Sequence, residues 1–562
     1  MRYIPYGMIN FKSIRNENYF YVDKTMYLEK LESPEQNKSV IFLRPRRFGK
    51  SLFTSMMNYY YAIDTADDYE SLFKGLYIYD HPTPNKNNYY ILKFDFSGMD
   101  ISGDNVVEEG KERFTFKVKN SIEEFVGRYK LNIEVNGNTA SELLMNMLKS
   151  FKELSLNNKI YVIIDEYDNF TNNILHDDAK DFLDLVNRNG YVRSFYEIIK
   201  EFSGIGVIDR FFATGVLPLT LDNLTNGFNI ATNISANSTF SSMIGFTHEE
   251  VKSIVNEVVP EEKRDEVYKD LETNYDGYRF STQNEERVFN STLVMYYLAD
   301  YCRTGRAPEN IIDPNMNVSG EKLLRYANLI NPDENKKILN QIVYENEVGG
   351  KIESVVLDNK FTTNDFITLL FYLGYITIKD VGGEVKFKIP NYVSSVIYSN
   401  YFVEMLNLEG KYDIGIDKIQ KAITELADDG KLTKMTGIIK DFLVTSSNRN
   451  TENFSEKDLK FLYMVFMRLS TQYNIYDEYQ AGQGFVDLYA QNITDLNLYE
   501  AVIELKYVKK SDVAKVNKEK LVEDAKAQLS KYMEDQRLGS KEKLKKFVIV
   551  FLGFEDYILK EI

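Results

Sequence analysis

Hydrophobic and polar positions alternate along the first part of the chain in the rhythm of strands followed by helices. Short, almost continuously apolar runs predict buried strands at 39–43, 90–95, 160–164 and 211–216. The first of these runs is followed at 51–62 by apolar and aromatic residues that suit a helix. Strands separated by helices indicate a parallel sheet, with functional groups at the carboxyl ends of its strands.

The pattern then changes and predicts more helix. Helices are predicted at 248–258, 291–302 and 364–373. Two short runs at 375–379 and 385–389 flank a Gly-Gly turn and predict a hairpin. A helix followed by such a hairpin can form a winged-helix element, but a packing module between two domains is the favoured interpretation. From Ser455 the pattern becomes helix, strand, strand, helix, strand.

Composition and charge exclude several functional classes. The formal net charge is −16, so the whole surface cannot coat nucleic acid or an anionic membrane, and any basic contact must be local. Cys302 is the only cysteine, which excludes a disulfide framework and a cysteine-based zinc site and favours a reducing, cytoplasmic compartment. The three histidines lie far apart, which disfavours His-based hydrolase chemistry. The longest mainly apolar stretches are shorter than the roughly 20 residues that cross a bilayer.

A basic loop that contains glycine lies between the first predicted strand and its helix. Its sequence, Arg44-Pro-Arg-Arg-Phe-Gly-Lys-Ser51, ends in the Gly49, Lys50 and Ser51 of a phosphate-binding loop. Backbone N–H groups and the start of the helix would point at an anion there. Lys50 can contact the β- and γ-phosphates, and the Ser51 hydroxyl can bind Mg²⁺. Arg44 stands where the pattern has glycine, so the loop alone is a weak signal.

Acidic residues end the clearest predicted strand. Asp165 is placed to hold Mg²⁺ directly or through water, and Glu166 can polarise an attacking water. The upstream Gly-Lys-Ser disfavours the alternative, in which both acids only end a strand. Thr214 can present a polar group near the γ-phosphate, although alone it would be no more than a strand-end turn. Arg46 and Arg47 can neutralise phosphate charge, in this chain or on a neighbouring subunit, and solvent-exposed arginines are an equal alternative.

A second group of charged residues interrupts apolar, strand-like sequence near the C-terminus. Asp487 follows Gly484-Phe-Val, and Glu504 and Lys506 lie within Tyr499–Tyr507. Alternate residues of a strand face the same side, so Glu504 and Lys506 share a face. Two carboxylates and a lysine can bind one or two divalent metals, which generate hydroxide and stabilise the transition state of phosphodiester cleavage. From the spacing alone, an ordinary salt bridge is the better interpretation.

Several segments taken together resemble one protein family. They are Tyr21–Thr25, Arg44–Ser51, Ile164–Asp168, Thr214–Val216, Gly245–Glu250, Tyr275–Phe280, Gly374–Thr377 and Ile389–Asn391. In this order they are similar to the AAA-ATPase-like proteins of bacteria that carry a C-terminal PD-(D/E)XK nuclease domain. The resemblance extends over nearly the whole chain, and its relatives share Arg44 in place of the first glycine of the loop. It implies an ATP-binding domain that uses Mg²⁺.

The same resemblance assigns residues to the C-terminal group. The two acids and the lysine described above match the PD-(D/E)XK core, although Val486 stands where the nominal pattern has proline. The resemblance implies that Glu478, on the preceding helix, supplements the metal site and that Gln528 lies on the following helix. It further implies Mg²⁺, or Mn²⁺ in its place, as the metal, and nucleic acid as the substrate, with DNA favoured.

Charge is unevenly distributed along the chain. From 501 to 562 there are fourteen Lys or Arg against eleven Asp or Glu, so all of the net negative charge lies before this segment. Lys506, Lys509, Lys510 and the lysines of 541–546 can follow a phosphate backbone. A charge run is more often only a solvated helix face, so the distribution supports a nucleic-acid contact without establishing it.

These observations together predict an α/β protein of four domains. We expect a P-loop AAA-ATPase-like domain at 1–245, a helical region with winged-helix character at 246–400, a helical connector at 401–454 and a restriction-endonuclease-like α/β domain at 455–562. The expected function is ATP binding and hydrolysis coupled to metal-dependent nucleic-acid cleavage, in defence or mobile-element biology. The alternative is a nucleotide-switched DNA- or protein-binding signalling protein with a nuclease-like domain that does not cut. A homo-oligomer is compatible with such an ATPase, and no membrane contact is expected.

Overall fold

The computed structural model describes most of the chain and divides it into two compact units. The described residues are 2–99, 106–169, 191–218, 230–316, 320–353, 361–408, 415–446, 454–470, 472–482, 484–493 and 498–562. The first unit comprises 1–299 with 325–390, and the second comprises 300–324 with 391–562. The four domain boundaries expected from the sequence stay a prediction.

A parallel sheet of five strands forms the centre of the first unit. Its strands are β1 (Ser39–Leu43), β2 (Tyr89–Asp95), β3 (Lys159–Asp165), β4 (Ile208–Gly215) and β5 (Thr232–Asn233), in the spatial order β2-β3-β4-β1-β5. The four predicted strands are thus confirmed, and β5 is an edge strand too short for its sequence to reveal. All five residues of β1 are buried, as the continuous apolar run predicts.

The register of this sheet brings the carboxyl ends of its strands to one edge. Leu43 of β1 lies opposite Gly215 of β4, and Asp95 of β2 lies opposite Asp165 of β3. β4 therefore separates the strand that leads into the phosphate-binding loop from the strand that ends in acids. The loop itself leads directly into α3 (Lys50–Tyr61), the helix that the sequence predicts.

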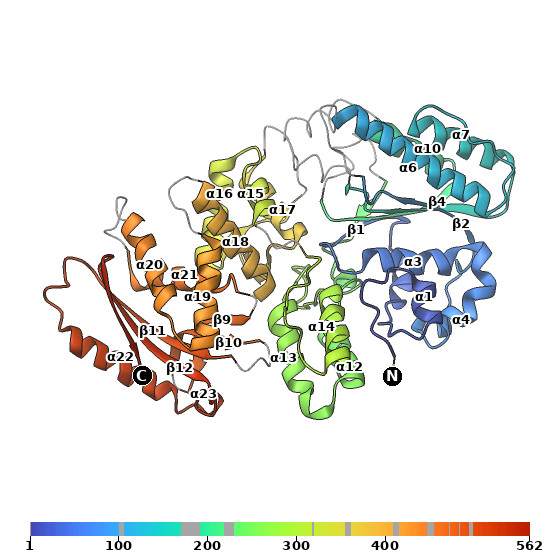
Figure 1. The fold of residues 1–562 in the computed structure, drawn as a ribbon. Coiled ribbons are helices and arrows are strands. Elements are labelled where there is room, and N and C mark those ends of the chain that lie inside the picture. Colours follow the sequence, from blue (N-terminus) through green and yellow to red (C-terminus); the bar gives the residue numbers. More distant parts are fainter. Residues whose placement is uncertain are drawn as a thin grey trace. The chain divides into compact units, whose positions relative to one another are not determined.

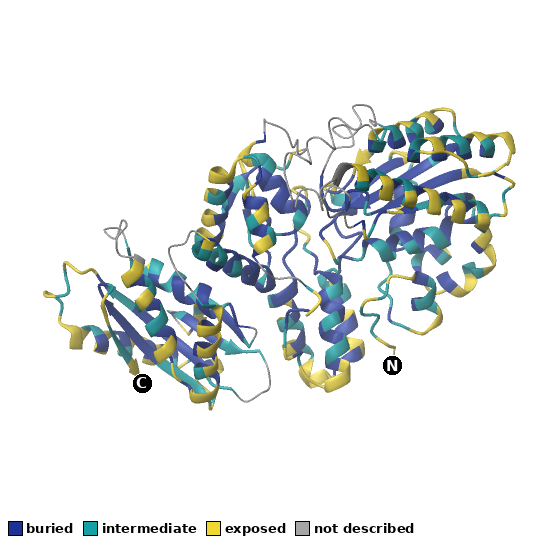
Figure 2. Ribbon diagram, turned by 45° about the horizontal axis from the view of Figure 1, so that its top comes forward, coloured by how far each residue is buried: buried dark blue, intermediate teal, exposed yellow. Residues whose placement is uncertain are grey.

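Helices cover both faces of the sheet (Figure 1). On one face lie α6 (Val106–Arg128), α7 (Ala140–Glu153) and α10 (Tyr191–Gly204), and on the other lies α3 with α1 (Phe11–Asn16) and α4 (Tyr69–Phe73). α10 buries Val192, Phe195, Tyr196, Ile199 and Phe202, the one-sided spacing of an amphipathic helix. Figure 2 shows this division, with buried strands between helices whose outer sides are exposed.

The remainder of the first unit is mainly helical. It contains α12 (His248–Val258), α13 (Arg264–Tyr275), α14 (Ser291–Thr304, which runs into the second unit) and α16 (Pro332–Glu345). α17 (Thr363–Leu373) and the hairpin of β7 (Thr377–Val381) and β8 (Val385–Lys388) follow, and β6 (Val348–Gly350) completes a sheet in the order β6-β8-β7. This is the helix, strand, helix and hairpin arrangement of a winged helix.

The winged-helix element is used for internal packing. Seven successive residues of α17, from Phe366 to Tyr372, are buried, so this helix presents no polar face to the groove of a nucleic acid. The Phe371 ring packs edge-on against Phe280, at 6.0 Å between centroids. A Cβ atom on Gly374 would lie 2.8 Å from the side chain of Pro45 in the phosphate-binding loop. The element therefore has the topology of a winged helix and also serves in internal packing, so the two interpretations of its sequence do not exclude each other.

The second unit contains a mixed sheet of five strands in the order β13-β12-β11-β10-β9. The strands are β9 (Tyr473–Ala481), β10 (Gly484–Asn492), β11 (Glu500–Val508), β12 (Leu544–Leu552) and β13 (Asp556–Glu561). β11 and β12 are parallel and are joined through α22 (Lys518–Tyr532), whereas the other pairs are antiparallel. The sequence pattern did not separate β9 and β13 from their neighbours.

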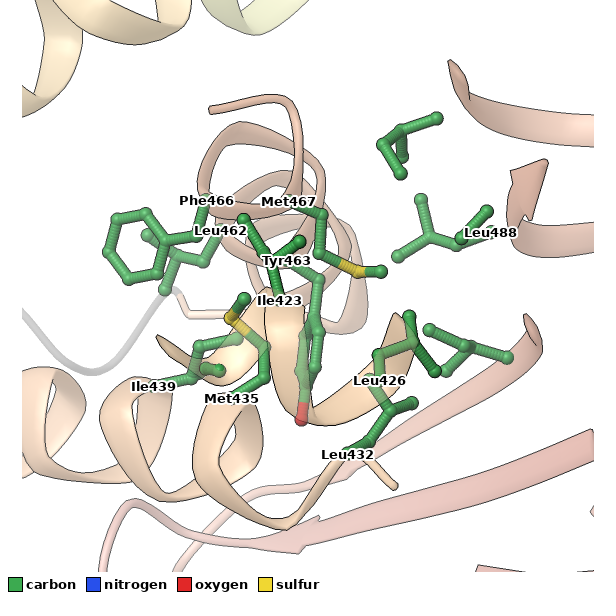
Figure 3. Close-up of a cluster of buried hydrophobic side chains, with 14 of the residues drawn as sticks. Ile423, Leu426, Leu432, Met435, Ile439, Leu462, Tyr463, Phe466, Met467 and Leu488 are labelled. Carbon is green, nitrogen blue, oxygen red and sulfur yellow. The ribbon is translucent and has the colours of Figure 1, made fainter. Parts of the chain in front are cut away.

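The two faces of this sheet enter different hydrophobic cores. Ala501, Ile503 and Leu505 of β11 join a core with α19 (Ile416–Asp429), α20 (Thr433–Ser446) and α21 (Glu456–Met467), part of which Figure 3 shows. Val502 and Val508 join the opposite core, beneath α22. Because side chains alternate along a strand, Glu504 and Lys506 have the parity of the α22 face. Among the described residues, no helix combines the length and apolar character that a membrane crossing needs.

Candidate functional site

The phosphate-binding loop lines a pocket of about 470 Å³ in the first unit. Arg46, Arg47, Gly49, Lys50 and Ser51 all contribute to its wall. Gly49 has a φ of 96° immediately before α3, a left-handed conformation that favours glycine, and Arg47 has a φ of 70°. The loop therefore makes its turn in the geometry that exposes backbone N–H groups at the start of a helix.

Lys50 lies inside the loop, where it is held by main-chain oxygens. Its Nζ donates to the carbonyl oxygens of Arg44 and Pro45, at 2.9 Å each. Burial lowers the pKa of Lys50, and the carboxylates of Asp168, Asp165 and Glu166 oppose this shift. The ammonium group therefore lies in the negative potential of these three carboxylates. An incoming phosphate would replace them as its negatively charged partner.

Arg44, which occupies the position of the missing glycine, has its guanidinium in the protein interior. Nη1 donates to the carbonyl oxygens of Leu43 and Ser235, and Nη2 donates to those of Phe240 and Ser241. The same group lies 4.1 Å from the ring centroid of Phe280 and 4.3 Å from that of Phe42. Burial lowers the pKa of Arg44 to about 9. Arg44 therefore anchors the loop to the protein interior through hydrogen bonds, and it does not line the pocket.

The acids that end β3 lie next to the loop. Asp165 is 2% exposed, and its Oδ2 accepts a hydrogen bond from Thr54 of α3 at 3.3 Å. Glu166 lines the pocket with a φ of 52°, and burial raises the pKa of its carboxyl. Thr214 is fully buried between the two site strands, where its hydroxyl donates to the carbonyl oxygen of Phe42 at 2.8 Å. Its side chain is thus engaged within the sheet and does not line the pocket.

The far side of the pocket comes from segments that the sequence analysis did not assign to it. Apolar side chains line it, namely Met8, Ile9, Phe20, Val22, Met243, Ile244 and Met295. Basic and hydroxyl groups of the loop and these apolar side chains thus line one cavity. Apart from Val22, which lies in the segment Tyr21–Thr25, no local motif marks these apolar residues, because they come from three distant parts of the chain.

The C-terminal candidate residues converge where β10 and β11 separate. The ladder between these strands includes Leu488, Tyr489 and Ala490, and beyond it the carboxylate of Asp487 accepts a hydrogen bond from the main-chain N–H of Leu505 at 2.8 Å. Lys506 Nζ lies 3.0 Å from Glu504 Oε1. The structure thus brings the two acids and the lysine of the predicted core together.

Glu504 is the most buried member of this cluster. It is 1% exposed, and its Oε2 atom has no hydrogen-bond partner among the described residues. Burial raises the pKa of Glu504 to about 7, and the neighbouring Asp487 carboxylate adds to the shift while Lys506 opposes it. Burial lowers the pKa of Lys506, but its acidic neighbours, Glu504 first, outweigh this and raise it overall. A buried, unpaired carboxylate oxygen beside a second carboxylate is a suitable pair of ligands for a divalent cation.

The helix that precedes these strands places Glu456, and not Glu478, next to Lys506. Glu456 begins α21, and its Oε1 lies 3.2 Å from Lys506 Nζ. Glu478 lies on strand β9, not on a helix, and pairs with Lys460 at 2.9 Å. The helical placement of Glu478 was wrong because Tyr473–Ala481, rich in tyrosine, pairs with β10 as a hairpin. The pattern Ser-Glu-Lys-Asp at 455–458, a helix-capping sequence, is the signal that could have located Glu456.

Gln528 lies on α22, as the resemblance implied. Its Nε2 donates to the hydroxyl of Tyr532 one turn later at 2.7 Å. Within the described part of the chain, no hydrogen bond or ion pair joins it to Asp487, Glu504 or Lys506. Its role in the site stays a prediction.

Two family models match separate parts of the chain. Residues 5–225 match the family described as predicted AAA-ATPase, and residues 454–561 match the PD-(D/E)XK nuclease superfamily. The chain joins an AAA-ATPase-like domain to a PD-(D/E)XK domain. The matched ranges contain the loop from Arg44 to Ser51 and all of β9 to β13, so the resemblance derived from the sequence is confirmed for these two regions of the chain.

Individual relatives are more distant. The chain is 29% identical over 289 residues to an uncharacterised protein in the vnfD 5′ region of Azotobacter chroococcum mcd 1. The match covers 51% of this chain and 50% of that relative, so the chain spans about half of the relative's length. Two solved Aeropyrum pernix structures also match. One is the ORC2 protein in ADPNP–ADP complexes, with 13% identity, coverage of 70% of this chain and 98% of that chain, and a TM-score of 0.33. The other is the ORC1 protein in complex with DNA, with 10% identity, coverage of 72% of this chain and 96% of that chain, and a TM-score of 0.23. Their low scores support no argument about function.

Proposed function

We propose that the chain binds and hydrolyses ATP·Mg²⁺ in the pocket of the first unit and cleaves nucleic acid with a divalent metal at the cluster of the second. The observation that carries the proposal is the convergence of Asp487, Glu504 and Lys506 in one cluster. In this cluster the Oε2 atom of Glu504 is buried and has no hydrogen-bond partner among the described residues. A binding domain without catalysis has no need of this arrangement, because a desolvated carboxylate costs free energy unless a cation compensates it.

The nucleotide pocket provides groups for each part of ATP. The apolar wall from Met8 to Val22 suits a base, and the loop from Arg46 to Ser51 suits the phosphates. Lys50 would leave its two carbonyl partners for the β- and γ-phosphates, and Ser51 and Asp165 would hold Mg²⁺. Glu166 lines the pocket with a raised pKa, which makes its carboxylate a better acceptor for the proton of an attacking water.

The residues of the C-terminal cluster fit a divalent cation. Asp487, Glu504 and Glu456 offer carboxylate oxygens, the donors that Mg²⁺ and Mn²⁺ prefer. When bound, the metal lowers the pKa of water and stabilises the charge of the transition state. Lys506, which is held between Glu504 and Glu456, would place a positive charge beside a phosphate oxygen. The N–H of Leu505 keeps the Asp487 carboxylate oriented.

Substrate and cellular setting follow from this proposal as expectations. We favour DNA as the nucleic acid, and the excess of lysine after position 500 supports a local contact with phosphates. The cytoplasm is the expected compartment, since Cys302 is the only cysteine and no disulfide protects the fold. The pairing of an ATPase with a nuclease suits defence or mobile-element biology.

The nucleotide site is tested by measuring ATP affinity with and without Mg²⁺. Lys50→Ala should weaken binding at least about tenfold, because a charge-assisted hydrogen bond contributes about 1.5–3 kcal/mol. Lys12→Ala is a matched control, since Lys12 pairs with Asp68 and does not line the pocket. Unchanged affinity in Lys50→Ala would show that the phosphate-loop assignment is wrong.

The nuclease site is tested by incubating the full-length protein with single- and double-stranded DNA and RNA in Mg²⁺ or Mn²⁺. Wild type should cleave at least one substrate, and Asp487→Ala should not. If wild type binds nucleic acid without cleaving any of the four substrates, with or without ATP, the alternative of a nucleotide-switched binding protein replaces the proposal.

A further inference from the structure

A second pocket of the first unit lies beside α12 and has no known role. Its volume is about 620 Å³. Its lining residues are Thr247, His248, Glu249, Arg279, Glu285, Glu286, Arg287, Lys379 and Asp380. None of these residues lines the nucleotide pocket, so the two cavities have separate walls.

Arg279 is a buried cation that no acid neutralises. It is 7% exposed, and its Nε donates to the carbonyl oxygens of Ser281 and Asn284 at 3.1 and 2.7 Å. Its Nη1 and Nη2 atoms form no hydrogen bond or ion pair with any residue in the described ranges. A buried charge is costly unless it is paired, so a guanidinium held at a pocket wall with both outer nitrogens unused indicates an anion.

Two further cations at or near this pocket have no acidic partner among the described residues. Arg287 is half-buried and lines the pocket, and Lys388 of β8 is half-buried nearby. Neither forms an ion pair or hydrogen bond with the described part of the chain. Burial lowers the pKa of Lys388, and the positive charges of Arg287 and Lys379 lower it further, while Asp276 only partly offsets them. Lys388 therefore lies within electrostatic range of both cations.

The four acids that line this pocket are exposed, as is Lys379, whereas its two arginines are not. Glu249, Glu285, Glu286 and Asp380 are all exposed, whereas Arg279 is buried and Arg287 is half-buried. Glu286 is moreover engaged by the hydroxyls of Ser241 and Ser242. Four exposed carboxylates at the rim repel a long polyanion such as a nucleic-acid backbone. A compact anion can pass the rim and reach the cations beneath it.

We propose that this pocket binds a small phosphate-bearing molecule, with Arg279 and Arg287 donating to its phosphate oxygens. Planar guanidinium groups match the oxygens of a phosphate better than a lysine does, because each can donate two parallel hydrogen bonds. The pocket is larger than one phosphate group, which leaves space for the organic part of the ligand. The site goes beyond both the ATP pocket and the nuclease cluster.

The test is a calorimetric titration of the full-length protein with inorganic phosphate and with pyrophosphate. It is carried out in the Lys50→Ala variant, so that the phosphate-binding loop does not contribute. We expect saturable binding with a Kd of about 1 mM or tighter. Arg287→Gln should weaken it at least about tenfold, the effect of one charge-assisted hydrogen bond.

Two further variants keep the test decisive. Arg279→Gln should weaken phosphate binding at least as much, and if this buried substitution unfolds the protein, Arg287→Gln decides alone. Lys386→Gln is the matched control. Lys386 lies on β8, as Lys388 does, but it pairs with Glu347 and does not line the pocket. Its affinity should stay within about twofold of the parent.

Three results would overturn the proposal. They are the absence of phosphate binding once Lys50 is removed, binding that Arg287→Gln leaves unchanged, and an equal loss in Lys386→Gln. A short DNA duplex added as competitor separates the sources of phosphate. Displacement of bound phosphate by the duplex would assign the pocket to a nucleic-acid backbone and reject the small ligand, whereas no displacement supports it.

Discussion

The main-chain N–H of Leu505 donates a 2.8 Å hydrogen bond to the side-chain carboxylate of Asp487. This bond replaces the ladder pairing at the point where β10 leaves β11, and it fixes one acid of the cluster relative to the strand that carries the other. The position of Asp487 is thus determined by the sheet itself.

We expect two substitutions of Asp487 to affect the stability of the fold and the affinity for metal differently. Asp487→Ala leaves the Leu505 N–H without a partner and should lower the free energy of unfolding by about 1–3 kcal/mol. Asp487→Asn keeps an acceptor oxygen and should stay close to wild type in urea denaturation, yet lose Mn²⁺ affinity in calorimetry. Equal stability of the two variants would contradict the structural role of the bond.

The contrast between Glu456 and Glu478 gives a matched pair of variants. Glu456→Gln removes a carboxylate that contacts Lys506 and should slow metal-dependent cleavage by about 10- to 100-fold, the usual effect of a partner next to the metal ligands. Glu478→Gln removes only the exposed pair with Lys460 and should leave the rate nearly unchanged. The reverse order of effects would restore the assignment implied by the family resemblance.

Arg44 should behave as a structural residue. Arg44→Gly recreates the glycine of the phosphate-loop pattern but removes four hydrogen bonds to carbonyl oxygens and two contacts with aromatic rings. The free energy of unfolding should fall by about 3 kcal/mol or more, without tighter ATP binding. Thermal unfolding and ATP titration of the same preparations measure both effects. Stronger nucleotide binding with unchanged stability would show that Arg44 instead obstructs the loop.

His248 should titrate above its ordinary range. Its Nε2 lies 3.3 Å from Asp276, and its pKa is raised first by this hydrogen bond, against the effect of burial, with Glu272 adding to the rise and Lys252 opposing it. A raised folded-state pKa means that the contribution of His248 to stability is complete below the unfolded value of 6.5 and is lost as pH rises through the folded value.

Proton NMR can measure this directly, because the chain has only three histidines and His248→Gln identifies the signal. The His248 resonance should titrate above 6.5, and Asp276→Asn should return it toward that value. A midpoint below 6.5 in wild type would mean that burial outweighs the acidic neighbours.

Four strands of the central sheet and the phosphate-binding loop could be predicted from local sequence. A few consecutive residues are enough to recognise the buried strand at 160–164. The same holds for Gly49-Lys50-Ser51, which follows the strand at 39–43. The interior position of Arg44 could not be predicted in this way, since its partners at Ser235, Phe240 and Phe280 lie about two hundred residues away.

Long-range packing also explains the error at the C-terminal site. Glu456 reaches Lys506 across a separation of 50 residues, because α21 packs against β11. Glu478 was placed on a helix by analogy, although the tyrosine-rich run of β9 itself has the composition of a strand. The shared face of Glu504 and Lys506 was predicted because a strand places alternate residues on one face, a rule that needs no tertiary information. Their grouping with Asp487 came from the family resemblance.

The most direct measurement is the single-turnover rate of nucleic-acid cleavage by wild type and Glu504→Gln, each in Mg²⁺, in Mn²⁺ and in a metal chelator. Glu504→Gln has nearly the same size as wild type and removes only the charge of the buried carboxylate. We predict metal-dependent cleavage by wild type, a loss of at least about 100-fold in Glu504→Gln and no cleavage in chelator. Equal rates in the two proteins, or cleavage that persists in chelator, would contradict the assignment of this cluster as a metal-dependent nuclease site.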